Sequence, residues 1–415
     1  MIINGLYQAE TRSSPGSCST DTTKTYIRLQ FLKGENMYYI TVKQPPSYHQ
    51  MTLEEFLFGS GSGAQLINAN LTNTRTYEVE EVSDRFLQLV DIDKLIAKLE
   101  WFNERTEYLR EKPRHEWYYE FHIPKKSGGL RKIDAPEPEL KEALRTLKNI
   151  FEVDFKALYH TSAFAYIQGR STLDLLKRHQ ANESKWFEKL DLSNFFGSTT
   201  MEWVLHMFSL VFPFSEVMKD DKGKEELTKA LELGFLDGGL PQGTPLSPTI
   251  TNIMMIPVDF EVARTLREYN HQRFVYTRYA DDFQISSKYG FSFMEIQNVI
   301  VSILNDFGAP FTIKKEKTRY GSSAGQNWNL GLMLNKDNEI TIGHKKKRQF
   351  QAMLSSYAMD RKNGTAWDKS DIQTMDGYRN YYRMVEGEKI DGIVKHLSEK
   401  FGVDIAKAIK EDLTA

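Results

Sequence analysis

The sequence predicts an α+β protein, because β-type runs and helical patterns occupy separate stretches of the 415-residue chain. The β-rich runs 274–277 and 283–286 lie on either side of Asp281 and Asp282, which indicates a hairpin with two carboxylates at its tip. Apolar residues recur at helical spacing over 86–102, and a helical pattern continues from Lys345 to the end. Hydrophobic residues make up 40% of the chain, which is enough to form buried cores.

The remaining elements follow from the same two periodicities. A hairpin is expected at 25–31 with 37–42, and residues 117–133 indicate a strand, a glycine turn and a returning strand. A further strand ends at Asp191, and a second late hairpin joins 327–334 to 339–342. Helices are expected over 138–151, 200–210, 224–235 and 293–306.

Charge, cysteine content and the lack of long apolar runs limit the classes to which the protein can belong. The net charge of −2 does not by itself indicate a nucleic-acid binder, but basic residues cluster at 125–132, 314–319 and 345–348, where they favour phosphate contacts. The single cysteine, Cys18, excludes an intramolecular disulfide and a cysteine-rich zinc site. Because the chain has neither an 18-residue apolar run nor a signal-peptide pattern, we expect a cytoplasmic protein with no membrane contact.

The acidic residues carry the chemistry. Adjacent carboxylates repel each other and are costly to desolvate, so a pair such as Asp281 and Asp282 in a cleft requires a cation. If the strand ending at Asp191 lies beside the hairpin in one sheet, all three acids converge. Mg²⁺ prefers hard oxygen ligands such as carboxylates, so the three acids together form a candidate magnesium site. Each acid taken alone is more typical of a surface turn than of a metal site.

A Pro/Gly-rich segment, 240–248, lies between these acids, and the ordered motifs resemble bacterial reverse transcriptases of the group II intron, retron and defence-associated kinds. The resemblance spans about 117–345 motif by motif. It implies a right-hand polymerase fold with an N-terminal extension of unknown role. The implied divisions are the extension at 1–85, fingers with the start of the palm at 86–190, a palm with an antiparallel sheet at 191–343 and an α-helical thumb at 344–415.

The resemblance also assigns the metal and nucleotide residues. Asp191, Asp281 and Asp282, with the backbone carbonyl of Leu192, would bind two Mg²⁺ ions, with Mn²⁺ as a substitute. Phe196 corresponds to the aromatic gate that would clash with a ribose 2′-hydroxyl and so select dNTPs, although a phenylalanine there is otherwise plain core.

In the Pro/Gly-rich segment, Gln242 is expected near the incoming nucleotide, and Gly243 would allow close backbone approach to it. Arg131 would grip the triphosphate with two parallel hydrogen bonds, with Lys125 nearby as a point charge. Lys317 is the candidate proton donor to pyrophosphate.

Other residues would hold template and primer. Arg170 would support the template, although a helix cap at Ser171 or Thr172 explains the same motif. Leu330 and Gly331 would form a primer grip, and Lys345 and Lys346 open the thumb beside the template–primer duplex. Aromatic residues in 377–382 would contact that duplex or form the thumb core.

The resemblance implies an RNA-directed DNA polymerase that makes cDNA from dNTPs, with a dedicated noncoding RNA as template, a DNA product or primer, and a role in bacterial antiphage defence. Ser247-Pro248 is similar to group II enzymes, and the Val-Thr-Gly signature of retron thumbs is absent, which favours the stand-alone defence class. One alternative is template-independent or protein-primed DNA synthesis. Another is a non-catalytic RNA-binding maturase or scaffold, which would have no need of three clustered acids. The sequence leaves a homo-oligomer open.

Overall fold

The computed structural model describes residues 7–12, 24–33, 36–43, 75–76, 91–125, 128–323, 328 and 331–414. The chain divides into two compact units, which we treat separately. The first unit comprises 1–166, 192–262 and 299–313, and the second comprises 167–191, 263–298 and 314–415. No helix within these described residues is long and apolar enough to cross a membrane.

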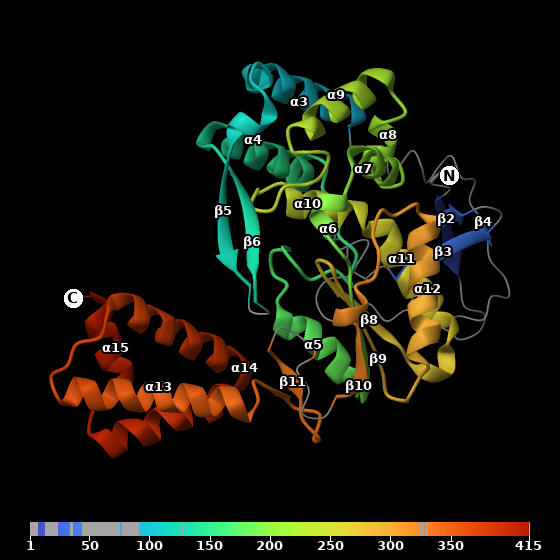
Figure 1. The fold of residues 1–415 in the computed structure, drawn as a ribbon. Helices are drawn as coiled ribbons and strands as arrows, with labels where there is room; N and C mark the ends of the chain where they lie inside the picture. Colours follow the sequence, from blue (N-terminus) through green and yellow to red (C-terminus); the bar gives the residue numbers. More distant parts are fainter. Residues whose placement is uncertain are drawn as a thin grey trace. The chain divides into compact units, whose positions relative to one another are not determined.

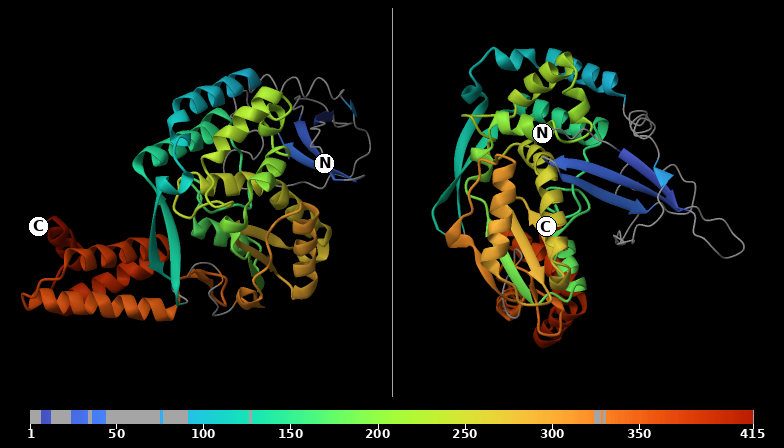
Figure 2. Two further views of the ribbon diagram at one scale, coloured as in Figure 1. Left: turned by 45° about the horizontal axis from the view of Figure 1, so that its top comes forward. Right: turned by 90° about the vertical axis from the view of Figure 1, so that its right-hand side faces the viewer.

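The first unit begins with a four-stranded antiparallel sheet of strand order β3-β2-β1-β4. Its strands are β1 (Tyr7–Arg12), β2 (Lys24–Lys33), β3 (Asn36–Lys43) and β4 (Arg75–Thr76). In Figure 2, β2 and β3 form the blue ribbon of this sheet. The pairing of Lys33 with Asn36 closes the hairpin expected at 25–31 and 37–42, so that expectation is confirmed.

A second antiparallel ribbon in this unit joins β5 (Tyr118–Pro124) to β6 (Leu130–Pro136), as the sequence predicted (Figure 1). Gly128 and Gly129 have φ of +88° and +79°, which suits glycine in the turn. The helices of this unit are α3 (Ile92–Arg105), α4 (Pro138–Asn149), α6 (Phe195–Ser198), α7 (Met201–Phe208), α8 (Phe214–Val217), α9 (Asp221–Glu232) and α10 (Ser247–Met254).

A side-chain cap explains where helix α3 begins. The Asp91 side chain accepts a hydrogen bond from the Lys94 amide and caps α3, whereas the expected helical residues 86–90 lie outside the described residues.

Phe151, Phe155 and Phe214 form edge and stacked ring contacts in the core of the first unit, with ring centroids 4.6–5.6 Å apart. Helices α11 (Ile256–Glu268) and α12 (Phe293–Asp306) run from one unit into the other, and α12 matches the predicted range.

The second unit is built on a four-stranded antiparallel sheet of strand order β10-β7-β9-β8. The strands are β7 (Trp186–Asp191), β8 (Val275–Tyr279), β9 (Asp282–Ser287) and β10 (Arg319–Ser322). Helix α5 (Thr172–Ala181) packs on one face, where His179 contacts the hydroxyls of Ser286 at 2.5 Å and Thr277 at 2.8 Å. Burial lowers the pKa of His179 to about 3, so the ring is neutral and serves as a structural link.

The rest of the second unit is a short hairpin followed by three helices. Residues 331–343, with β11 (Met333–Leu334) and β12 (Ile340–Thr341), form what we call the 331–343 hairpin. Helices α13 (His344–Lys362), α14 (Lys369–Phe401) and α15 (Ile405–Thr414) follow, which confirms the helical pattern expected from Lys345.

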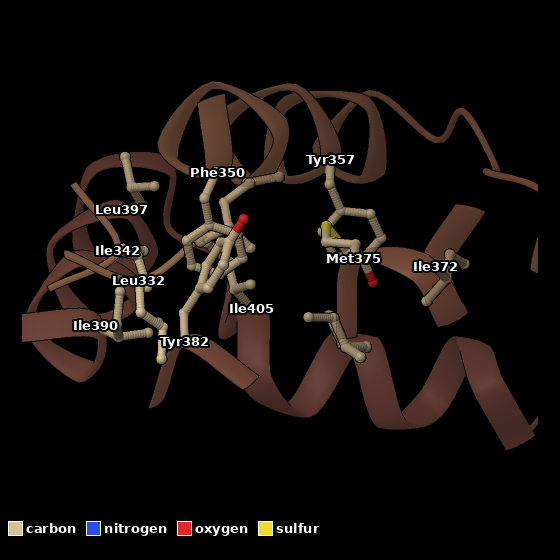
Figure 3. Close-up of a cluster of buried hydrophobic side chains, with 14 of the residues drawn as sticks. Leu332, Ile342, Phe350, Tyr357, Ile372, Met375, Tyr382, Ile390, Leu397 and Ile405 are labelled. Atoms are coloured by element: carbon tan, nitrogen blue, oxygen red, sulfur yellow. The ribbon is translucent and has the colours of Figure 1, made fainter. Parts of the chain in front are cut away.

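One apolar cluster joins this hairpin to the helices (Figure 3). Leu332 and Ile342 of the hairpin pack with Phe350, Tyr382 and Ile390 of the helices. Tyr382 therefore belongs to the core, as one of the two interpretations of 377–382 predicted, whereas Tyr378 is exposed and stacks on it.

Candidate active site

The strand register brings the three predicted acids to one end of the second unit's sheet. Asp191, the last residue of β7, lies directly opposite Asp282, the first residue of β9. Tyr279 pairs with Asp282, so Ala280 and Asp281 form a two-residue turn, with Ala280 at φ +56°. Directly opposed residues on antiparallel strands have Cβ atoms about 4.5–5.5 Å apart. The predicted convergence of the two motifs in one sheet is therefore confirmed.

A buried arginine supports this turn from the other face of the sheet. Arg278 is fully buried, and its Nη1 donates to the carbonyl of Ala280 at 3.1 Å. Because side chains alternate along a strand, Arg278 points away from the face that carries Asp282. The turn that presents Asp281 is thus held by an interaction outside the acidic face.

Two lysines neutralise part of the acidic charge. Lys317 Nζ donates to both carboxylate oxygens of Asp191 at 2.8 Å, and Lys189 Nζ donates to Asp282 Oδ2 at 2.5 Å. Three carboxylates and two ammonium groups leave one negative charge in excess when all are ionised. We predicted a role for Lys317 from the sequence but overlooked Lys189. The available signal was its position two residues before Asp191, which places both side chains on the same strand face.

Burial and charge repulsion raise the pKa of Asp281 and Asp282. Burial, followed by the charges of Asp282 and Asp191, raises the pKa of Asp281 to about 6. Burial also raises the pKa of Asp282, against the opposing effect of Lys189. Burial alone would lower the pKa of Lys317, but its hydrogen bond to Asp191 and the three carboxylate charges outweigh this, and its pKa is raised. The site therefore favours added positive charge.

The carboxylate oxygens are of the kind that binds Mg²⁺, although Lys317 and Lys189 donate hydrogen bonds to Asp191 and Asp282. Among the residues that the structure describes, no three His, Cys, Asp or Glu side chains are gathered as a ready metal site. Asp282 Oδ1, however, is buried without a hydrogen-bond partner, and carboxylate oxygens are the hard ligands that Mg²⁺ prefers. A bound cation would supply the partner that this oxygen lacks, so the residues fit such an ion.

Leu192 follows Asp191 and forms an isolated bridge with Ile313. The backbone bonds beside it run from Ser193 N to Thr312 O and from Lys314 N to Asp191 O, at 2.8 Å each. The carbonyl of Leu192 accepts neither of these bonds, which leaves it compatible with the predicted ligand role.

The predicted nucleotide residues lie in the first unit. Phe196 is half-buried in α6 and meets Phe195 edge-on, with ring centroids 5.6 Å apart. Its carbonyl accepts a hydrogen bond from Leu240 N at 3.0 Å, which ties the predicted gate segment to the Pro/Gly-rich segment. Arg131 is exposed on β6 and Lys125 is exposed where the β5–β6 turn begins.

Gly243 approaches protein backbone closely. The Gln242 carbonyl accepts a hydrogen bond from Asp134 N at 2.8 Å, which ties the segment to β6. Gly243 has φ +122°, and a Cβ there would lie 2.8 Å from Ile133 Cγ2 and 3.0 Å from Asp134 O. The glycine is required by this contact with β6, a reason that the sequence did not reveal.

The predicted template and primer residues lie in the second unit. Ser171 caps α5 in a capping box with Asp174, so the cap interpretation of that motif is confirmed, and Arg170 precedes the cap. Gly331 has φ +101°, and its carbonyl accepts a hydrogen bond from Lys346 Nζ at 2.9 Å, whereas Lys345 is exposed. Leu330 lies outside the described residues.

Residues 123–351 match the family model described as reverse transcriptase (RNA-dependent DNA polymerase), which covers more than half of the chain. The chain belongs to the reverse transcriptase family. It is therefore an RNA-directed DNA polymerase with the α+β right-hand fold of that family, preceded by the N-terminal strands β1–β4.

Curated relatives of this reverse transcriptase include bacterial retron enzymes. Retron Ec83 reverse transcriptase of Escherichia coli is 27% identical over 71% of this chain and 90% of the relative. Retron Mx162 reverse transcriptase of Myxococcus xanthus is 31% identical over 46% of this chain and 39% of the relative. These relatives support a retron-like reverse transcriptase, although the absence of the Val-Thr-Gly signature had argued against the retron class.

A solved structure of apo telomerase from Candida tropicalis, truncated from its C-terminal domain, is also similar. It is 14% identical with a TM-score of 0.38, and the match covers 66% of this chain and 62% of the telomerase chain. The family model, and not this distant likeness, supports the fold assignment.

Proposed function

We propose that this reverse transcriptase joins dNTPs to a primer at Asp191, Asp281 and Asp282 by two-metal-ion nucleotidyl transfer. The observation that carries the proposal is the direct opposition of Asp191 and Asp282 beside the turn of Asp281. Two Mg²⁺ ions, held by these carboxylates and the Leu192 carbonyl, would activate the primer 3′-hydroxyl and stabilise the leaving pyrophosphate.

Two lysines would balance charge and hold protons at this site. Lys317 donates hydrogen bonds to both carboxylate oxygens of Asp191, which places its ammonium group beside the acids, where it would donate a proton to the leaving pyrophosphate. Lys189 orients the Asp282 carboxylate through Oδ2, which leaves Oδ1 directed to another partner. Both roles require the ammonium groups to be held close to the acids, as their hydrogen bonds support.

The remaining site residues would select substrates. Phe196 would exclude the ribose 2′-hydroxyl, and Gln242 and Gly243 would shape the nucleotide site. Arg131 and Lys125, which are exposed, would bind the triphosphate. The division into fingers, palm and thumb at the boundaries predicted from the sequence is part of this proposal.

We further propose that the template is a dedicated noncoding RNA and that the cytoplasmic enzyme acts in antiphage defence. The similarity to retron reverse transcriptases supports a specialised bacterial role. Arg170 and the 331–343 hairpin, with Leu330, Lys345 and Lys346, would hold the RNA template and the primer strand. If deletion of the noncoding DNA beside the gene left phage protection intact, the dedicated-template proposal would be wrong.

The experiment compares wild type with an Asp281→Asn, Asp282→Asn double variant, each purified with its retained nucleic acid. Mg²⁺ and labelled dNTPs are added without external template, and the retained RNA and any product are sequenced. DNA complementary to the bound RNA, made by wild type alone, is expected. DNA unrelated to that RNA would indicate template-independent synthesis, and DNA linked to protein after protease treatment would indicate protein priming. Full phage protection by the double variant would indicate a scaffold.

A further inference from the structure

A buried glutamate interrupts the long helix α14. Glu386 has φ −137° and ψ 56°, which is not helical, within the helix Lys369–Phe401. Its side chain is 3% exposed. Burying a carboxylate costs its hydration unless other groups donate hydrogen bonds to it. The groups that contact Glu386 therefore indicate why the helix is interrupted at this residue.

The partners of Glu386 come from the 331–343 hairpin and the start of α13. Oε2 accepts hydrogen bonds from Thr341 Oγ1 and from the Ile342 amide, both at 2.9 Å. Oε1 accepts a hydrogen bond from Lys347 Nζ at 2.6 Å, and Lys389 Nζ lies 3.7 Å from it. One carboxylate thus joins the last strand of the hairpin to α13 and α14.

This carboxylate is charged at neutral pH. Burial alone would raise the pKa of Glu386, but hydrogen bonds from Lys347, Ile342 and Thr341 outweigh burial, and the pKa is lowered. Hydrogen bonds that involve an ionised group are shorter and stronger than neutral ones. The three contacts therefore form a strong and directional link.

The polar link of Glu386 lies beside an open cavity. A cavity of about 430 Å³ opens beside Glu386's partners, lined in part by Met333, Leu334, Thr341, Lys347 and Lys389. Leu332, Leu334 and Ile342 of the hairpin also pack in the apolar cluster of the helices, where Figure 3 shows Leu332 and Ile342. Apolar packing and the polar link of Glu386 therefore both hold the hairpin on the helices, and the polar link supplies the directional contacts.

We propose that Glu386 is a positioning residue that fixes the 331–343 hairpin to the thumb helices and so sets how firmly the enzyme holds the primer end. The inference deepens the proposed function, because it rests on the primer-grip role of this hairpin. Glu386 touches no reacting atom in this scheme and acts through the backbone of Ile342 and the side chain of Lys347.

The first test measures DNA length per binding event for a Glu386→Gln variant, with a trap that captures released enzyme. The count of nucleotides added before release does not depend on the fraction of folded enzyme, so a merely structural role would not change it. Glutamine presents an N–H₂ group to Lys347 or to the hairpin and breaks the charged link. We expect the product length to fall about tenfold, in line with the strength of hydrogen bonds to charged groups.

Two further variants sharpen this test. Glu399→Gln makes the same change at an exposed residue of α14, outside the hairpin, and should leave product length unchanged. Adding Lys347→Met to Glu386→Gln removes the unpaired ammonium and should restore part of the length. Unchanged product length in Glu386→Gln, or an equal loss in Glu399→Gln, would overturn the proposal.

A second measurement needs no polymerase activity. In a Glu386→Ala variant, hydrogen exchange of the hairpin amides, including Ile342, should accelerate about tenfold or more, because its acceptor is lost. The amides of β7 and β9 should exchange at the wild-type rate. Protection that is unchanged, or lost equally in the hairpin and the sheet, would contradict the positioning role. Wild type that made no DNA would overturn the proposed function, while this exchange result would still decide whether Glu386 holds the hairpin.

Discussion

Glu188 provides a stability prediction that can be worked out from the structure. It is fully buried on β7, between Tyr320 and Ile285 of the neighbouring strands, and neither carboxylate oxygen has a hydrogen-bond partner. Burial raises its pKa from an ordinary value of 4.5 to about 8. At neutral pH the group is therefore a protonated acid, because water that would solvate the charge is excluded.

The sign of the pH effect follows from proton linkage. The folded state binds this proton more tightly than the unfolded state, so its contribution to stability is complete below pH 4.5 and is lost as pH rises towards 8. One pH unit within this window is worth about 1.4 kcal/mol. Glu188 should therefore lower the free energy of unfolding by about 2 kcal/mol between pH 6 and pH 8.

The perturbation is Glu188→Gln, which keeps the size of the side chain but cannot ionise. Urea unfolding of wild type and variant is followed at pH 6, 7 and 8 by tryptophan fluorescence, to which Trp328 contributes because it stacks on Phe187 next to Glu188 in β7. The difference in unfolding free energy should move in favour of the variant by about 2 kcal/mol over this range.

The control is Glu399→Gln, at an exposed position of the same unit, which should track wild type at every pH. Parallel stability curves for wild type and Glu188→Gln would refute the reasoning, because they would mean that Glu188 does not titrate between the folded and unfolded states. A wild type that became more stable with rising pH relative to Glu188→Gln would refute it as well.

Three further outcomes are expected. Asp282→Asn should reduce primer extension by about 10²–10³-fold, and chelation of divalent ions should abolish it in wild type until Mg²⁺ or Mn²⁺ is restored; activity in EDTA would contradict the metal mechanism. Phe196→Ala should raise the kcat/KM ratio of ribonucleotides to deoxynucleotides by at least about tenfold, and an unchanged ratio would remove its assignment as a gate. Gly243→Ala should lower the free energy of unfolding by about 1–3 kcal/mol, because the new Cβ would lie 2.8 Å from Ile133 Cγ2. Gly238→Ala, at φ +80° with no atom within 4 Å of the new Cβ, should cost less. Equal losses of Tm in the two variants would show that the contact with Ile133 is unimportant.

Much of the fold could be predicted because its signals are local. Runs of residues that favour strands identified β7 to β9, and the range of α12 followed from its helical periodicity. The start of α5 was harder, since one motif suited both a template contact and a cap at Ser171, and only its hydrogen bonds with Asp174 identified the cap. The short strands β11 and β12 were predicted at greater length than they have, because boundaries depend on pairing partners.

The sequence predicted the acids of the candidate site but not every lysine that contacts them. Asp281 and Asp282 stand out because two adjacent carboxylates at a hairpin tip repel each other, and positive charge nearby is needed to offset that repulsion. Lys189 was overlooked because a lysine in a strand is common, and only the register places it diagonally across from Asp282 on the same face of the sheet.

The sequence by itself determined the element types, the three acids and the membership of the reverse transcriptase family, because periodicity, turn chemistry and motif order are properties of neighbouring residues. Only the tertiary structure decided that Gly243 meets β6, that Glu188 is buried without a partner, and that Glu386 of α14 binds hairpin residues 44 and 45 positions earlier in the chain. These facts depend on strand register and on contacts between distant segments. A carboxylate's charge and role follow from the groups that replace its water, and those groups are brought to it only by folding.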